Sequence, residues 1–384
     1  MDISKFQGSD CYMHVHWAFA NVTTDWAVDV SGYQGQFDGL LNLTGISRIL
    51  SFGGWGFSTT SYTYSIFRTG VQTANQQTFA QNVVDFIVDN NLDGVEFDWE
   101  YPGAQDIPGV PADSVESPQN YLEFLKIDYI VYMTYDLHGQ WDYNRTYADP
   151  GCPNGGCLRS QVNKTETEYA LSMITKAGVP AKQVVAGLAM YGRSFKMAEA
   201  NCTEPECLFT GPDSGADAGE CTQTPGYLAN YEIYEILVQA ENPDLYGNIS
   251  ITQYHDEGDV LIYNETNWMS WLSLSSYAAR QSWTDGLNFG GTSHWAVDLN
   301  ETYSNNGTGN ELSSGLELDF TVCEYSLTFA SLRPGRLAAH RLRRRLYSAG
   351  ADRHAGHGLH QLHQREQRLR RDVHLPKQSS FDTE

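Results

Sequence analysis

The sequence lacks any apolar run long enough to span a bilayer, and positive charge is scarce: 24 Lys and Arg face 47 Asp and Glu, for a formal net charge of −23. The first absence excludes a membrane-spanning protein, and we expect no membrane partner. The second argues against nucleic acid as a partner, because an acidic body repels the phosphate backbone. Outside one acidic stretch, His, Cys and Asp do not group at ligand spacing, so we expect no metal and no cofactor. Aromatic residues, by contrast, make up 12% of the chain. They suit a neutral ligand such as a sugar, whose apolar ring faces stack on aromatic surfaces.

An apolar signal segment is also missing at the start, where Asp2, Lys5 and Gln7 interrupt the chain, so we expect the true N-terminus to be absent. The Asn-x-Ser/Thr sequons nevertheless indicate a secreted, extracellular glycoprotein, because they are far denser than chance. They lie at Asn21, Asn42, Asn144, Asn163, Asn201, Asn248, Asn264, Asn300 and Asn306.

Cysteines cluster in loops rich in Gly, Pro and Asn. The clustered residues are Cys152, Cys157, Cys202, Cys207 and Cys221. Close pairs in such loops favour disulfides in an oxidising compartment over a zinc site, which would want Cys-x-x-Cys pairs or histidines alongside. Because the chain has 7 cysteines, at least one has no partner within it, and we expect this to be Cys11 or Cys323.

An acidic run, Asp-Gly-Val-Glu-Phe-Asp-Trp-Glu, occupies residues 93–100. Apolar and aromatic residues between the carboxylates favour a strand, in which Glu96, Asp98 and Glu100 face one way. Spaced about 6.6 Å apart along the backbone, they cannot all ionise independently, so the row retains a proton. We expect Glu100 to hold it, and such an acid can protonate a leaving group. A solvated face or a divalent-metal loop fits less well, because a metal loop needs oxygen ligands on a turn with a central Gly.

This run closely resembles the D-x-x-D-x-D-x-E signature of family 18 chitinases, and Tyr101-Pro102-Gly103-Ala104 continues it as in fungal members. Four other segments resemble family motifs in the same order along the chain. They are Ile49–Trp55 (third-strand S-x-G-G), Tyr132–Asp136 (sixth-strand Y-M-T-Y-D), Ala189–Phe195 (seventh-strand M-Y-G-R-S-F) and Gly291–Ala296 (eighth strand). The resemblance covers roughly residues 10–300.

The resemblance implies a substrate-assisted, retaining cleavage of chitin, in which the sugar's own acetamido carbonyl attacks the anomeric carbon. Glu100 would be the general acid, Asp98 would stabilise the acetamido N–H, and Tyr135 would donate to the acetamido carbonyl. The substrate-binding residues that it implies are Trp55, Tyr101, Met133, Asp136, Tyr191, Arg193 and Trp295.

One departure from the family touches this chemistry. The middle aspartate of the signature is Glu96 here, one methylene longer. In the family this catalytic residue shares a proton with the position of Asp98 and contacts the motif serine, here Ser51. Since a misplacement of about 1 Å can cost on the order of a hundredfold in rate, we expect the longer side chain to disturb Asp98 and slow turnover.

Alternating strands and helices predict an α/β fold, a TIM (β/α)8 barrel. We expect strands at residues 12–20, 48–52, 93–100, 129–133, 184–189 and 291–296, and helices at 76–90, 120–126, 166–177 and 227–241.

The barrel is expected to be incomplete. Residues 118–128 hold one short helical stretch, whereas relatives fit a helix, the fifth strand and another helix into this interval. A crossover between parallel strands needs about a dozen residues or more. The chain also begins at the approach to strand two. We therefore expect strands one and five to be missing, with an internal loss at Lys126-Ile127.

The catalytic barrel is expected over residues 1–310, with a small α+β insertion at about 196–275 before the last strand. Residues 311–384 form a C-terminal tail that is basic from 331, where twelve of the 24 Lys and Arg lie. We expect this tail to be disordered or translated out of frame, because it has no sustained apolar periodicity. The alternative is a basic amphipathic helix at 342–346 for a membrane or nucleic acid.

Three functions follow from these patterns. The first is a monomeric, secreted chitinase, endo-acting, that cleaves β-1,4 linkages in chitin or chitooligosaccharides. The second is a chitin-binding lectin, against which the retained Glu100 argues. The third is an inactive product, because missing strands would expose sheet edges and leave the core unfilled.

Overall fold

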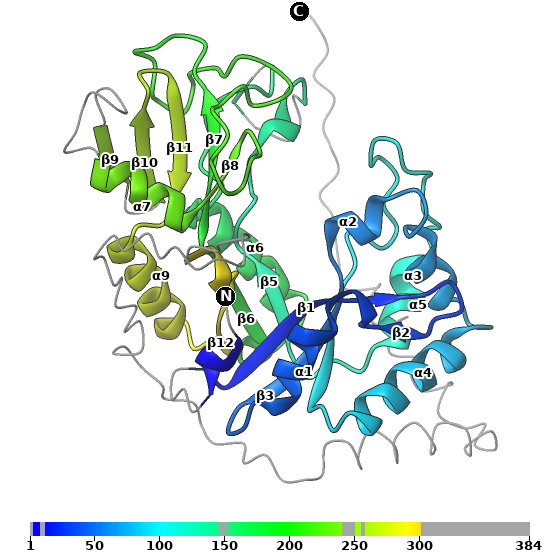
Figure 1. Cartoon of the computed structure of the whole chain (residues 1–384). Coiled ribbons are helices and arrows are strands. Elements are labelled where there is room, and N and C mark those ends of the chain that lie inside the picture. Colours follow the sequence, from blue (N-terminus) through cyan, green and yellow to red (C-terminus); the bar gives the residue numbers. More distant parts are fainter. Residues whose placement is uncertain are drawn as a thin grey trace, which may run out of the picture. The chain divides into compact units, whose positions relative to one another are not determined.

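The computed structural model of the chain (Figure 1) describes residues 3–7, 12–145, 151–152, 154–239, 250–254 and 258–300. These residues divide into two compact units. We call residues 14–43 and 47–120 the N-terminal unit, and the described residues within 1–13, 44–46 and 121–300 the C-terminal unit.

A four-stranded sheet with the order β2-β1-β3-β4 forms the N-terminal unit. Its strands are β1 (His14–Val22), β2 (Val28–Asp29), β3 (Ser47–Gly53) and β4 (Gly94–Asp98). β1, β3 and β4 run parallel, and β2 is antiparallel to β1. The helices of this unit are η2 (Ser31–Tyr33), α1 (Gln34–Asn42), α2 (Gly54–Thr59), α3 (Ser65–Gly70) and α4 (Gln76–Asp89).

The core of this unit lies behind the acidic strand. Phe97 stacks on Phe52 of β3 at 5.3 Å between ring centroids, and its edge meets Phe79 of α4 at 5.7 Å. Phe52 and Phe79 are fully buried, as are most apolar residues of the helical stripe of α4. Because successive side chains of a strand alternate faces, the packing of Phe97 against these rings turns Glu96 and Asp98 to the opposite face.

The C-terminal unit contains two sheets. Three parallel strands follow the order β12-β6-β5, and five antiparallel strands follow the order β8-β7-β11-β10-β9. The parallel strands are β5 (Ile130–Met133), β6 (Val184–Ala189) and β12 (Gly291–Trp295). The antiparallel strands are β7 (Tyr191–Lys196), β8 (Tyr227–Ala229), β9 (Ser250–Tyr254), β10 (Gly258–Tyr263) and β11 (Asn267–Trp271).

Helices complete the C-terminal unit, and the sequence boundary between the two units falls within α5 (Ser117–Phe124). The others are η1 (Ile3–Phe6), η3 (Gln140–Asp142), α6 (Lys164–Lys176), η4 (Ala181–Gln183), α7 (Asn230–Gln239), α9 (Leu274–Gly286) and η5 (Val297–Asn300). Asn163 caps α6 by accepting a hydrogen bond from the Glu166 amide, which explains why this helix begins where it does.

Most predicted elements are confirmed within a few residues, and one is wrong. The helix expected over residues 227–241 begins only at Asn230, and Tyr227–Ala229 instead forms β8, paired with β7. The buried helical spacing of Ile233 and Ile236 extended the prediction too far toward the N-terminus. The acidic strand is also shorter than expected, because β4 ends at Asp98 and leaves Glu100 beyond it.

Two disulfides, Cys152–Cys157 and Cys202–Cys207, confirm the expected loop pairing. Cys221 is a free cysteine among the described residues. Cys11 and Cys323, for which a missing partner was predicted, lie outside the described residues, as does the tail from 301 onward. Over the described ranges, no helix has the length and apolar character needed to cross a membrane.

Candidate active site

The acidic row emerges at the carboxyl end of β4, next to the end of β3. The parallel register pairs Ser51 with Glu96 and Gly53 with Asp98. Gly53 has φ +113°, and a Cβ there would lie 2.0 Å from the Asp98 carbonyl oxygen. Only glycine allows this approach, so the Gly-Gly of the S-x-G-G motif is what brings β3 against the row.

Glu96 is held by two neighbouring strands. Ser51 Oγ of β3 donates a hydrogen bond of 2.6 Å to its Oε2, and His16 Nδ1 of β1 lies 2.7 Å from the same oxygen. Burial raises the pKa of Glu96, but the contacts with His16 and Ser51 outweigh it, so that the pKa is lowered. The middle carboxylate is therefore stabilised as an anion.

Asp98 behaves in the opposite way. Burial, followed by repulsion from Glu100 and from Glu96, raises its pKa to about 7. A pKa raised in this way agrees with the expectation that the row retains a proton near neutral pH, and it points to Asp98 as a residue that can hold it. Glu100 is half-buried. Its backbone amide donates a hydrogen bond of 3.0 Å to Ser58 Oγ of α2, which fixes the chain just beyond the strand. Glu100 as the proton holder stays a prediction.

A cavity of ≈ 570 Å³ opens beside the ends of β1 and β3 in the same unit. Trp55, which is 52% exposed, lines it, together with Tyr33 and Tyr62, which are 59% and 76% exposed. Exposed aromatic rings around a hollow are unusual unless they bind something. Tyr101, after the row, is likewise 49% exposed.

In the C-terminal unit, Asp136 and Arg193 form a bidentate ion pair. Arg193 Nε and Nη2 donate to the two carboxylate oxygens of Asp136 at 2.7 and 2.8 Å. The guanidinium also lies over three rings, at 5.1 Å from Trp141, 5.3 Å from Tyr191 and 5.1 Å from Tyr227. A planar cation with two parallel hydrogen bonds to one carboxylate and rings on its faces has a well-defined orientation.

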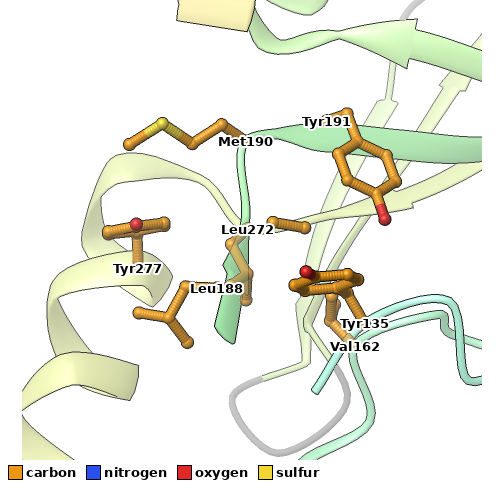
Figure 2. Packing of buried hydrophobic residues seen from close by; sticks show 8 residues of the cluster. Tyr135, Val162, Leu188, Met190, Tyr191, Leu272 and Tyr277 are labelled. Carbon is orange, nitrogen blue, oxygen red and sulfur yellow. The ribbon is translucent and has the colours of Figure 1, made fainter. Parts of the chain in front are cut away.

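The remaining predicted residues of this unit share one buried cluster (Figure 2). The ring of Tyr135 meets that of Tyr191 edge-on at 5.9 Å, and Met133 and Trp295 pack against the same cluster from the ends of β5 and β12. In Figure 2, Tyr135 and Tyr191 lie on one side of Leu188, opposite Tyr277. The motif residues of three separate strands are therefore brought together. Burial raises the pKa of Tyr191 well above its usual value, so its hydroxyl stays protonated.

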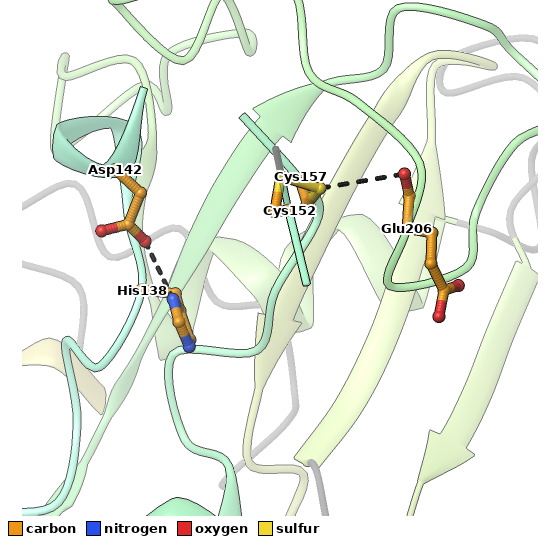
Figure 3. The surroundings of a disulfide bond; sticks show 5 residues. All are labelled: His138, Asp142, Cys152, Cys157 and Glu206. Atoms are coloured by element: carbon orange, nitrogen blue, oxygen red, sulfur yellow. Dashed lines mark hydrogen bonds and ion pairs between the residues drawn. A yellow bond between two sulfur atoms is a disulfide. The ribbon is translucent and has the colours of Figure 1, made fainter. Parts of the chain in front are cut away.

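The loop after β5 is fastened by a buried histidine that the sequence did not single out. His138 Nδ1 lies 2.9 Å from Asp142 of η3 (Figure 3), and Nε2 lies 3.1 Å from Glu166 in the first turn of α6. Burial lowers the pKa of His138, but hydrogen bonds to Asp142 and Glu166 outweigh it and raise the pKa to about 9. The imidazolium thus clamps the loop that carries Asp136.

Sequence reasoning also missed His16, Trp141 and Tyr227. Each lies near a predicted residue only through strand pairing or through a loop that folds back. One signal was available for His16, a titratable side chain within a strand whose neighbours are mostly apolar. Trp141 follows the sixth-strand motif by five residues, and its nearly two-fifths exposure is visible only in the structure.

A sequence model of the glycosyl hydrolases family 18 matches residues 2–127 and 125–300. A "Probable chitinase LysM18" of Penicillium expansum is 44% identical over 338 residues, covering 78% of this chain and 23% of that protein. A "Secreted chitinase LysM12" of the same organism is 41% identical over 325 residues, covering 75% and 22%. The chain therefore spans less than a third of the length of these relatives.

Solved structures agree on the fold. The Group IV chitinase of Ostrinia furnacalis in complex with allosamidin superposes with a TM-score of 0.61 at 21% identity, over 78% of this chain and 87% of that one. Human YKL-39, described as a pseudo-chitinase with retained chitooligosaccharide binding properties, gives a TM-score of 0.55 at 19% identity, over 75% and 85%. At these identities the likeness establishes a TIM-barrel-like α/β fold.

Proposed function

The chain belongs to glycosyl hydrolase family 18, and we propose that it hydrolyses the β-1,4 linkages between N-acetylglucosamine units of chitin or chitooligosaccharides. The observation that carries this proposal is the acidic row, in which a half-buried Asp98 with a pKa of about 7 adjoins Glu100. A protonated carboxyl group next to an acid is suited to glycosidic chemistry near neutral pH.

The proposed mechanism is retaining and substrate-assisted. The acetamido carbonyl oxygen of the sugar bonds to its own anomeric carbon as the glycosidic C–O bond breaks, and Glu100 gives its proton to the leaving oxygen. Asp98 stabilises the acetamido N–H while positive charge develops, and Tyr135 donates to the acetamido oxygen. Water then attacks the anomeric carbon as the bond from the acetamido oxygen breaks, which restores the acetamido group, and the water gives a proton to Glu100. Two inversions leave the configuration retained.

Each unit carries proposed substrate-binding residues of its own. Trp55 and Tyr101 present exposed rings in the N-terminal unit, which suit the apolar faces of sugars. In the C-terminal unit, Asp136 and Arg193 form a rigid polar pair for hydroxyl or carboxamide groups. Met133, Tyr191 and Trp295 supply the apolar floor of the site. We further propose an endo-acting, secreted monomer without nucleic-acid or membrane partners, in keeping with the loop disulfides and the sequons.

The barrel is proposed to lack the strand that would follow β4. Two observations support this: the family match falls into two segments that meet at residues 125–127, and β4 and β5 are each the outermost strand of their sheet in the described residues. The barrel would extend over residues 1–310, with an insertion near 196–275, and the tail 311–384 would stand outside it. An open edge at β4 would leave the acidic row more accessible to water than in a closed barrel.

The test is release of methylumbelliferone from its β-chitotrioside by the whole chain and by Glu100→Gln, with isothermal titration of chitopentaose on both. Glu116→Gln, at an exposed position of the same unit, is the matched control. We expect Glu100→Gln to lose about 10²–10⁴-fold in kcat while binding is retained. Equal rates in the two proteins would overturn Glu100 as the acid. Binding without hydrolysis by the unaltered chain would replace the chitinase with a lectin, and loss of both would leave an inactive product.

A further inference from the structure

His16 meets Glu96 across an intervening strand. β1 and β4 flank β3 on either side, with His16 paired to Ile49 and Glu96 paired to Ser51. Neighbouring strands lie about 4.8 Å apart, so the backbones of β1 and β4 are separated by roughly 9.6 Å. The 2.7 Å contact between Nδ1 and Oε2 therefore depends on two long side chains reaching over β3.

The length of Glu96 is what makes this reach possible. An aspartate at the same position would end one methylene earlier, about 1.5 Å short of the imidazole. The glutamate that departs from the family signature is thus matched by a histidine on β1. The longer side chain of Glu96 and the imidazole of His16 therefore match each other in length and position.

The charges around this pair come from all three strands. His14 of β1 precedes His16 by two residues on the same face, with 6.2 Å between the ring centroids. Asp93, which precedes β4, is bonded to Arg48 of β3, Asp98 follows Glu96 on the same face of β4, and Glu100 lies beyond the end of the strand. Ser51 Oγ already donates to Oε2, so a proton on His16 Nδ1 gives this oxygen a second donor.

We propose that His16 is a positioning residue that holds Glu96 as an anion bonded across β3, so that the proton of the row resides on Asp98, beside Glu100. The proposal rests on the proposed function only where it names Glu100 as the acid. Two hydrogen bonds to Oε2, from Ser51 and His16, favour the ionised form of Glu96, and repulsion from this anion favours protonation of Asp98. Without His16, Glu96 would compete for the same proton and take it two residues farther from the acid.

The experiment measures where the proton sits, independently of activity. Side-chain carboxyl ¹³C shifts of Glu96 and Asp98 are followed by NMR from pH 4 to 9 in the unaltered chain, His16→Leu, Glu96→Asp and the control His14→Leu. In His16→Leu we expect the midpoint of Asp98 to fall and that of residue 96 to rise, each by about one pH unit. Glu96→Asp should give the same exchange, because the shortened side chain cannot reach His16. His14→Leu should leave both midpoints within about 0.3 units.

His16→Gln separates charge from hydrogen bonding and also guards against misfolding of the leucine variant. Its amide can still donate to Oε2, so we expect a shift about half as large as with leucine. Unchanged midpoints in His16→Leu, or in His16→Gln and Glu96→Asp if leucine is not tolerated, would overturn the proposal. Where the chain hydrolyses chitotrioside, the limb of the kcat/KM pH profile assigned to Asp98 should move with its midpoint. A shifted midpoint without any hydrolysis would sustain the role of His16 and count against the proposed function alone.

Discussion

Two acidic sites in this chain handle negative charge in opposite ways. In the N-terminal unit, Asp98 stands between Glu96 and Glu100, and repulsion from both adds to burial in raising its pKa to about 7. In the C-terminal unit, Asp136 receives both prongs of Arg193, which is itself covered by aromatic rings. The first site gathers like charges, and the second balances each charge with an opposite one.

The difference separates proton chemistry from fixed recognition. An arginine does not give up its proton in proteins, so Arg193 remains a fixed positive charge beside Asp136. A row of crowded carboxylates must share protons, and its ionisation responds to small changes in its surroundings. An aspartate thus stands among like charges in one site and beside a fixed opposite charge in the other.

The largest effect should come from neutralising one aspartate in each site. Asp98→Asn removes the carboxyl group proposed to stabilise the acetamido N–H as positive charge develops, and we expect kcat to fall about 10²–10³-fold with KM little changed. Asp136→Asn leaves Arg193 without its carboxylate and should instead raise KM by about tenfold. Steady-state kinetics on the fluorogenic chitotrioside measure both. The reverse pattern, a KM effect at Asp98 and a kcat effect at Asp136, would break the distinction.

Removing Arg193 should leave Asp136 without an opposite charge, as Asp98 is in the acidic row. Arg193→Met leaves Asp136 unpaired, and we expect unfolding free energy to fall by about 3 kcal/mol, the lower end for a broken pair because the carboxylate is partly exposed. Arg145→Met, at an exposed position of the same unit, should change it by less than about 0.5 kcal/mol. Urea unfolding gives both values. Equal losses would mean that the ion pair contributes nothing specific.

Local sequence predicted the strands that carry the row and the motif residues, because their apolar period and turn residues are local properties. It did not predict the antiparallel strands β7, β10 and β11, since buried edge-to-edge pairing is decided by residues far apart in the chain. β8 was missed because the predicted helix was begun three residues too early, at Tyr227 instead of Asn230.

Site residues that belong to a sequence motif could be predicted from the sequence. Residues that reach the site only through strand pairing or a returning helix could not. Glu96 looked like a disturbing substitution from the sequence, and only the alignment of β1, β3 and β4 reveals His16 as its neighbour. His138 looked like one histidine in a loop, and only the return of α6 brings Glu166 to its second nitrogen. Side chains recruited across strands carry no local signature.

His138 forms a third charged site, in which a histidine that can lose its proton lies between two carboxylates, Asp142 and Glu166. Its pKa, raised to about 9, means that its stabilising effect is complete below about pH 6.5 and is lost as pH rises toward 9. We expect His138→Gln to lower unfolding free energy by about 2 kcal/mol at pH 7, because Asp142 is left buried without its cation and Glu166 is partly solvated. Thermal unfolding from pH 6 to 10 should show a falling melting temperature in the unaltered chain and a flatter curve in the variant. Burial lowers the pKa of His14, so this histidine is not the source of the fall. The control His14→Gln should therefore show the same decrease in melting temperature between pH 7 and 9 as the unaltered chain.

The smallest effect concerns the stability cost of the row itself. Asp98 has a folded-state pKa of about 7, above the ordinary value near 4, so its ionisation disfavours the fold increasingly as pH rises between these values. Asp98→Asn removes this penalty, and we expect it to gain about 1 kcal/mol over the unaltered chain between pH 4 and pH 8, after allowance for partial solvation. Glu96→Gln should act in the opposite sense, because the pKa of Glu96 is lowered and its contribution is lost as pH falls. The same direction of change in stability for both variants across this pH range would contradict the prediction. Glu96 and Asp98 would then ionise alike, as expected of an evenly solvated acidic face.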